Sequence, residues 1–180
     1  MINQHEYREF ISSFTNKMYH LKTNKPFSDY VFLCVGSDKV IGDAFGPLVG
    51  SQLYKLLKNH YTNIHIIGTL DKPVLGTNLK KTIFDIEKNY ANPCIIAIDS
   101  ALSKKEDIGK VFVSNEKMKF AKGTRNDFIE VGNISVKGVV AQDCKVPKYN
   151  FSVLQNTPLG KVLNLAQMTA NGIFESIKYK

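Results

Sequence analysis

The fold is decided by residues 31–49, which read VFLCVGSDKVIGDAFGPLV. The apolar residues that end at Gly36 predict a strand buried on both faces of a sheet. The apolar residues from Leu48 to Leu57 share one face of a helix. Glycines at positions 36, 42 and 46 permit a tight turn between the two elements, and this turn presents the carboxylate of Asp43 just before the helix. Because ligands and chemistry lie beyond the strand ends of parallel sheets, Asp43 stands where a site is expected.

Composition indicates one domain over residues 1–180. The chain has 180 residues, of which 43% are apolar, enough for one sizeable core and too few for a second domain of normal size. The longest uncharged apolar runs are only strand-sized, and residues 1–25 carry both charge signs without an apolar centre. Neither a membrane span nor export is predicted, so we expect a cytoplasmic protein.

Cysteine content and charge argue against a cysteine-based metal site and against a dedicated nucleic-acid-binding face. The three cysteines are scattered and form no metal-ligand pattern, and Cys34 and Cys94 lie in predicted buried strands. The net charge of +8 is consistent either with a nucleic-acid-binding face or with a solvated basic surface. The lysines are spread along the chain without an aromatic-interleaved stripe, which favours the solvated surface. Such a surface can attract an acidic protein substrate.

The order of apolar segments predicts an α/β fold. Strands alternate with helices as far as Ile98, and this alternation is typical of right-handed crossovers and a parallel sheet. A terminal helix at each end of the chain carries one apolar face, the second beginning with Thr157 as its N-cap and Pro158 at its first position. The fold class expected is a three-layer sandwich with a mostly parallel central sheet. The expected strands cover about residues 30–35, 63–68, 94–98, 109–113 and 134–140, with helices near 48–60 and 78–90 and a basic loop over 117–127.

Three aspartates each follow a predicted strand. Asp43 follows the first, Asp71 the second, and Asp99 stands where the third is expected to stop. Neighbouring parallel strands lie about 4.8 Å apart, so two of these carboxylates can come close enough to share a proton or a metal ion. A shared proton leaves one carboxyl as a base and the other as an acid toward a bound water. A shared divalent cation instead lowers the pKa of that water.

Structural explanations compete with this chemistry. Asp43 is well placed as a helix N-cap, Asp99 can cap or turn its loop, and Asp71 belongs to an Asp-Lys-Pro turn. Other catalytic schemes are less well supported, since Ser37 and Ser100 have no clear histidine partner and the chain contains no GxSxG, GxGxxG or GxxxxGK[ST] motif. From spacing alone, both the catalytic and the structural explanations of the aspartates stay open.

Four blocks of the chain resemble the YyaC family of sporulation proteins. They are residues 36–49 (GSDKVIGDAFGPLV), 68–74 (GTLDKPV), 98–102 (IDSAL) and 131–140 (VGNISVKGVV). The resemblance spans about residues 30–142. That family is similar in turn to the spore germination protease, which degrades small acid-soluble spore proteins, and more distantly to the hydrogenase-maturation endopeptidases.

The resemblance implies a fold, a site and a location. The fold is the phosphorylase/hydrolase-like α/β sandwich of those peptidases, and Asp43 and Asp99 correspond to the catalytic aspartates of the germination protease. By the same resemblance the function is a sporulation-associated endopeptidase acting in the forespore or spore core on a protein or peptide substrate, with small spore proteins as candidates. Ser37, Asp38, Asp71 and Ser100 would line the substrate cleft.

The implied site departs from that of the maturation peptidases at one point. There the positions of Asp43 and Asp99 are metal ligands, and a histidine further along completes the site. The histidines here are at positions 5, 20, 60 and 65, none in the second half of the chain. We therefore expect an aspartate pair without metal or other cofactor. A non-catalytic sporulation factor that uses the fold as a binding module and a metal-dependent maturation peptidase remain alternatives, and the sequence leaves the oligomeric state open.

Overall fold

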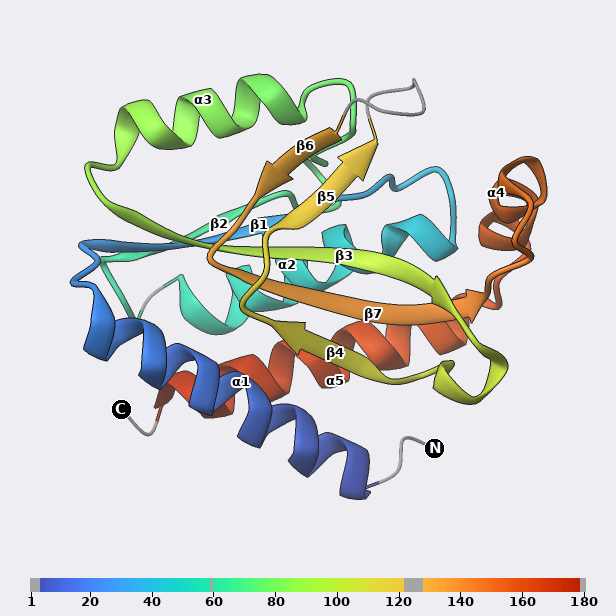
Figure 1. Ribbon diagram of the computed structural model, residues 1–180, viewed down its shortest axis with the longest axis horizontal. Coiled ribbons are helices and arrows are strands. Elements are labelled where there is room, and N and C mark those ends of the chain that lie inside the picture. The colour runs from blue at the N-terminus through green and yellow to red at the C-terminus, as the bar shows by residue number, and fades with distance from the viewer. Residues whose placement is uncertain (1–3, 59, 122–127, 179–180) are drawn as a thin grey trace.

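A central five-stranded sheet organises the computed structural model, which describes residues 4–58, 60–121 and 128–178. Helices cover one face of the sheet, and a helix with a small hairpin covers the other (Figure 1). The elements are α1 (Gln4–Asn24), β1 (Asp29–Cys34), the 3₁₀ turn η1 (Gly42–Ala44), α2 (Phe45–Leu57), β2 (Ile64–Ile67), α3 (Leu79–Asn89), β3 (Pro93–Ser103), η2 (Lys105–Asp107), β4 (Val111–Ser114), β5 (Met118–Ala121), β6 (Phe128–Val131), β7 (Ile134–Gln142), α4 (Pro147–Gln155) and α5 (Leu159–Lys178).

The sheet is mostly parallel, as the alternation of strands and helices predicts. Its strand order is β2-β1-β3-β7-β4, and only the edge strand β4 runs antiparallel to its neighbour. The fold is therefore the three-layer α/β sandwich expected from the sequence. None of the described helices is long and apolar enough to cross a membrane.

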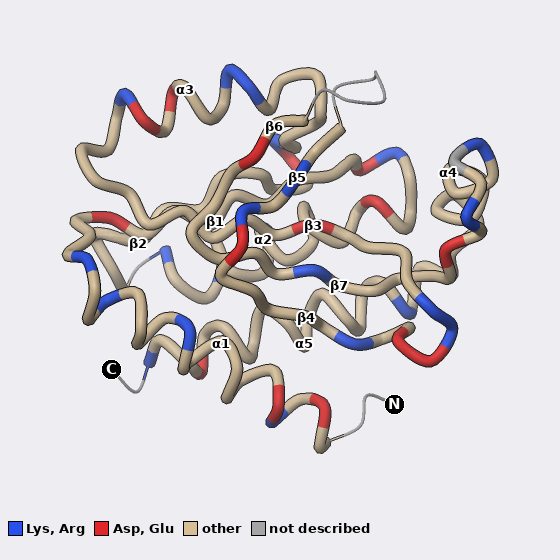
Figure 2. Tube along the Cα trace, in the orientation of Figure 1, with Lys and Arg blue, Asp and Glu red and all other residues tan. Residues whose placement is uncertain are grey.

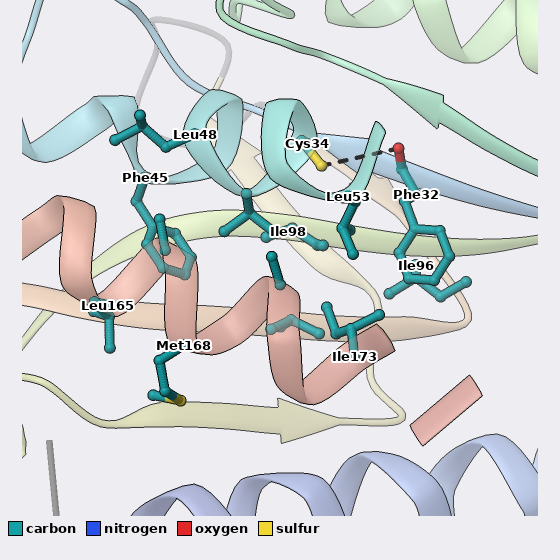
Figure 3. Packing of buried hydrophobic residues seen from close by; sticks show 14 of the residues in the cluster. Phe32, Cys34, Phe45, Leu48, Leu53, Ile96, Ile98, Leu165, Met168 and Ile173 are labelled. Atoms are coloured by element: carbon teal, nitrogen blue, oxygen red, sulfur yellow. Dashed lines mark hydrogen bonds between the residues drawn. The ribbon is translucent and has the colours of Figure 1, made fainter. Parts of the chain in front are cut away.

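Alternation along the central strands divides the interior into two cores. In β1, Phe32 and Cys34 face α1, α2 and α5, whereas Val31 and Leu33 face α3 and the β5–β6 hairpin. All four side chains are fully buried. Figure 3 shows the first core, in which helix side chains pack over the strands. A strand that is buried on both faces must be apolar at every position, and this explains the uninterrupted apolar run.

The third strand is longer than predicted. The expectation that it stops at Asp99 is wrong, because β3 continues through Ser103. Its last pair with β1 joins Cys34 to Ile98, after which β1 leaves the sheet. β7 stays alongside β3 as far as the pair between Ser103 and Gln142. The ladder to β7 supplies backbone hydrogen bonds that keep these more polar residues extended.

Two further elements were absent from the sequence prediction. The expected basic loop over 117–127 contains β5 at its start, and β5 pairs with β6 to form a hairpin that closes the second core with Met118 and Val131. The rest of that predicted loop, residues 122–127, lies outside the described residues. The short helix α4 precedes α5, and the hydroxyl of Thr157, the expected N-cap, donates to the carbonyl of Val153 in α4.

Candidate active site

The turn after β1 folds back toward the end of the strand. The N–H of Val35 donates to the carbonyl of Ile98 over 2.8 Å, and the N–H of Gly36 donates to the carbonyl of Val74 over 2.9 Å. Gly36 has φ +142°, and a Cβ there would lie 2.0 Å from the carbonyl oxygen of Asp43. Any other residue would push the turn away. Glycine is therefore what allows Asp43 to return to the end of β1.

Asp43 lies in the 3₁₀ turn η1 and does not cap α2. The N-cap of α2 is Ala44, and no side chain caps that helix by a hydrogen bond. The alternative that Asp43 is a capping residue is therefore wrong. Its carbonyl accepts the N–H of Ser37 over 3.2 Å, which closes the turn. The carboxylate is only partly exposed and remains available for chemistry.

Tight packing on both sides fixes the η1 turn. The buried ring of Phe45 lies against Gly138 of β7, where an added Cβ would come within 2.6 Å of ring atoms. Gly42 lies against Leu154 of α4, and an added Cβ there would come within 2.7 Å of that side chain. Small residues thus allow β7 and α4 to hold the turn that carries Asp43.

Asp99 stands where β1 and β3 separate. It is the first residue of β3 beyond the last pair with β1, and it lies opposite Lys137 of β7. Its Oδ1 accepts the N–H of Ser100 over 2.7 Å. The side chain is only partly exposed, and it lies just beyond the point where the β1–β3 pairing ends. Asp99 is therefore a strand residue, and the alternative in which it caps or turns a loop is wrong.

Burial raises the pKa of both carboxyl groups, and the charge of Asp43 also acts on Asp99. Burial raises the pKa of Asp99 well above its usual range, and the charge of Asp43 raises it further. The Ser100 N–H and the charge of Lys137 oppose this rise without cancelling it. Burial also raises the pKa of Asp43, against a hydrogen bond from the backbone of Ser37. Because the rise is the stronger one at Asp99, we expect Asp99 to hold the proton when one of the two groups is ionised.

The other predicted site residues do not all lie next to this aspartate pair. Ser37 and Ser100 each bond through their backbone N–H to one of the two aspartates. The Ser37 hydroxyl accepts the N–H of Lys39 over 3.1 Å, and Asp38 is exposed in the same turn. Asp71 is exposed and lines a cavity of about 520 Å³ between α2 and β2, whose lining includes neither member of the pair.

The side chains around the pair do not fit a three-ligand metal centre. Within residues 4–58, 60–121 and 128–178, no three histidine, cysteine, aspartate or glutamate side chains are grouped so as to hold a metal ion. His65 is committed elsewhere, with its Nε2 2.8 Å from Asp29 Oδ1 and its ring 4.2 Å from that of Tyr90. The group that faces Asp99 across the strand pair is the cation Lys137, which repels a metal ion.

Lys137 is the residue of this region that sequence reasoning missed. The stretch ISVKGVV predicts a strand, and β7 runs through it. The signal that could have identified this residue is its charge, since lysine is the one charged residue among the seven of this stretch. Elsewhere Lys and Arg are spread along most elements rather than gathered on one of them (Figure 2), as expected for a solvated basic surface.

Sequence comparison relates the chain to one protein family over nearly its whole length. The profile described as "Protein of unknown function (DUF1256)" matches residues 2–172. A relative from Bacillus subtilis (strain 168), described as "Uncharacterized protein YyaC", is 36% identical over 143 residues, which are 79% of this chain and 67% of that protein. This relative agrees with the resemblance drawn from the four sequence blocks.

Structural comparison finds a peptidase of similar fold. The NiFe hydrogenase maturation protease HycI from Thermococcus kodakarensis KOD1 superposes with a TM-score of 0.56 at 14% identity, covering 86% of this chain and 95% of that one. The maturation protease HybD from Thermococcus kodakarensis gives a TM-score of 0.44 at 15% identity, over 83% of this chain and 98% of that one. The likeness to HycI shows that this chain shares the α/β fold of that protein.

Proposed function

This chain belongs to the DUF1256 family, and we propose that it is a peptide-bond hydrolase that activates water with the aspartate pair Asp43 and Asp99. The observation that carries the proposal is the placement of two aspartates where β1 leaves β3, with Asp43 in the turn after β1 and Asp99 as the first residue of β3 beyond the last pair with β1. The effect of the Asp43 charge on the pKa of Asp99 supports this placement. Two carboxyl groups with separated pKa values are the usual arrangement for acid and base chemistry on one water molecule. The peptidase-like fold and the maturation protease HycI support the choice of a peptide bond as substrate.

The two aspartates take different roles because their environments differ. Asp43, the ionised member, accepts a proton from water as the water oxygen bonds to the peptide carbonyl carbon. Asp99 gives its proton to the carbonyl oxygen, so the intermediate is an uncharged diol. Asp43 then returns a proton to the leaving nitrogen while Asp99 takes one from a diol oxygen, and the C–N bond breaks. The products are a carboxylic acid and an amine, and both aspartates regain their starting states.

Neighbouring groups complete the proposed cleft. Ser100 follows Asp99 directly, and Ser37 and Asp38 lie in the turn that leads to Asp43. These three residues would contact the peptide backbone, with Asp71 further away at the β2 end. From the resemblance to the sporulation proteins, the proposed activity would take place in the forespore or spore core, with small spore proteins as candidate substrates. No step of this mechanism requires a bound cofactor.

The test is cleavage of a peptide library. Purified protein would be incubated with tryptic peptides of a bacterial lysate, and new termini would be counted by mass spectrometry. We expect cleavage by the wild type and its loss in Asp43→Asn and Asp99→Asn, both folded by circular dichroism. Asp85→Asn on α3 is the matched control, since Asp85 pairs with Lys81 and should keep full activity.

One outcome would favour a non-catalytic binding module over a peptide-bond hydrolase. If the wild type produced no new termini while it retained peptides or proteins by binding, and if both asparagine variants retained them equally, the fold would serve as a binding module. Cleavage that survived both substitutions would instead place the catalytic groups elsewhere.

A further inference from the structure

Three side chains form a row across the sheet beside the aspartate pair. Asp99 of β3 lies opposite Lys137 of β7, and Lys137 lies opposite Phe112 of the edge strand β4. Residues that are directly opposite in neighbouring strands project from the same face of a sheet. The row therefore begins at the carboxyl group of Asp99, continues with an ammonium group and ends with an aromatic ring.

This row lies on a part of the sheet that the second layer does not cover. Ile95 and Ala97, which share the face of Asp99, are buried beneath α3 and the β5–β6 hairpin. The cover does not extend further along the strands. This is seen from Lys137, which is exposed, and from Phe112, which keeps 46% of its surface in contact with solvent. Figure 1 shows the hairpin across β1, with its lower end near the first part of β3, and α4 beyond the ends of β3 and β7. An open surface thus lies beside the pair.

Packing does not account for a lysine at this position. Its chain neighbours Val136 and Gly138 are buried, and the ammonium takes part in none of the ion pairs within 4.0 Å found in the described part of the chain. By contrast, the ammonium of Lys110, in the loop before β4, lies 3.1 Å from the carboxylate of Asp107. Among the described residues, Lys137 therefore has no ion-pair partner within 4.0 Å, and it lies opposite Asp99 in the neighbouring strand.

We propose that Lys137 is a further catalytic residue of this site, whose ammonium supplies the positive charge that a metal ion provides in metal-dependent peptidases. This inference rests on the proposed function. The substrate carbonyl oxygen and the Asp99 carboxylate share one negative charge as the proton passes between them, and Asp99 lies on the face from which Lys137 projects. A fixed cation at this place stabilises that charge throughout the step.

The position of Lys137 also predicts how a metal site could be created. A strand neighbour opposite Asp99 is close enough for both side chains to ligate one ion. Lysine prevents this by its charge, whereas an imidazole would join the two carboxylates as a third ligand. Lys137→His should therefore gain a zinc site that the wild type lacks.

The first arm of the test measures zinc binding by calorimetry and does not depend on activity. We expect no saturable zinc binding by the wild type, a single-site isotherm for Lys137→His, and loss of that isotherm in Lys137→His with Asp99→Asn. Lys80→His is the control, because Lys80 is exposed on α3 without a carboxylate one turn away. Saturable zinc binding by the wild type at the aspartates, or no gain in Lys137→His, would overturn the inference.

The second arm uses the tryptic peptides of the cleavage assay. Lys137→Met should lower kcat by about 100-fold with little change in KM, as for loss of one group that stabilises charge in the transition state. Lys137→Arg should recover most of this loss because it restores the cation. Full activity of Lys137→Met would overturn the catalytic role. If the wild type cleaves nothing, the proposed function fails, and the zinc arm still decides whether Lys137 faces the pair.

Discussion

Replacing Asp99 by asparagine removes the ionisable group and keeps the shape of the side chain. The amide keeps the size of the side chain and can accept the same hydrogen bond from the Ser100 N–H. What it removes is an acid whose ionisation is disfavoured both by burial and by the charge of Asp43. Each unit by which the folded pKa exceeds the unfolded pKa costs about 1.4 kcal/mol of stability once the carboxyl is ionised.

From the direction of this shift we expect Asp99→Asn to raise the free energy of unfolding at pH 8, and the usual cost of a buried polar group sets the size at about 2 kcal/mol. This lies within the range of about 1–3 kcal/mol for burying a polar group without full compensation. In a chain of 180 residues it corresponds to a rise in Tm of about 4–8 °C. The variant should thus be more stable than the wild type while it is catalytically inactive, a trade-off that is common at active sites.

The pH dependence of this gain follows from the direction of the pKa shift. Because the pKa of Asp99 is raised on folding, the folded state binds its proton more tightly than the unfolded chain. The stability associated with that proton is complete below the unfolded pKa of about 3.9 and is lost as the pH rises through the folded pKa. Wild type and Asp99→Asn should be similar at pH 3 and diverge toward pH 8.

Urea unfolding of both proteins at pH 3, 5 and 8 measures this difference. Asp107→Asn is a control of opposite sign, since hydrogen bonds from Ser103 and Lys110 lower the pKa of Asp107. That variant should lose stability at pH 8 and match the wild type below the lowered pKa. A stability of Asp99→Asn equal to or below that of the wild type at pH 8, or a gain that persists at pH 3, would refute the reasoning.

Two further predictions concern packing and thiol exposure. Gly46→Ala should lower the free energy of unfolding by about 1–3 kcal/mol, because the new Cβ would lie 2.0 Å from the carbonyl oxygen of Val35. The control Gly160→Ala, where a Cβ would meet nothing within 4 Å, should change the free energy of unfolding by less than about 0.5 kcal/mol. Equal losses of stability in urea unfolding would contradict this prediction. Of the three free cysteines only Cys144 is exposed, so a thiol reagent should modify one group in native protein and three after denaturation. Rapid reaction of Cys34, whose pKa burial raises, would show that its core is open.

Periodicity in the sequence was sufficient to predict the central fold. The apolar run before Gly36 and the spaced apolar residues of α2, α3 and α5 each have one arrangement that buries them, so the parallel sheet and its covering helices follow. The hairpin was missed because Met118 and Val131 are single buried residues in short strands with polar neighbours. Nothing in a local pattern distinguishes such a segment from a loop.

The candidate site was only partly accessible from the sequence. Spacing after strands and the family resemblance singled out Asp43 and Asp99, but could not show that β3 continues past β1 and leaves Asp99 beside the gap. That feature depends on where two strands separate, which no single segment encodes. Lys137 was missed for the same reason, since its importance comes from its register opposite Asp99.

The central claim is that Asp43 and Asp99 act as one coupled pair, and carbon NMR titration of the aspartate carboxyl groups tests it most directly. The spectrum of the wild type would be compared with that of Asp43→Asn. We predict that the Asp99 carboxyl titrates well above its usual range in the wild type and shifts downward in Asp43→Asn, because the neighbouring charge is gone. An Asp99 carboxyl that titrates in its usual range, or that ignores the loss of the Asp43 charge, would contradict the account.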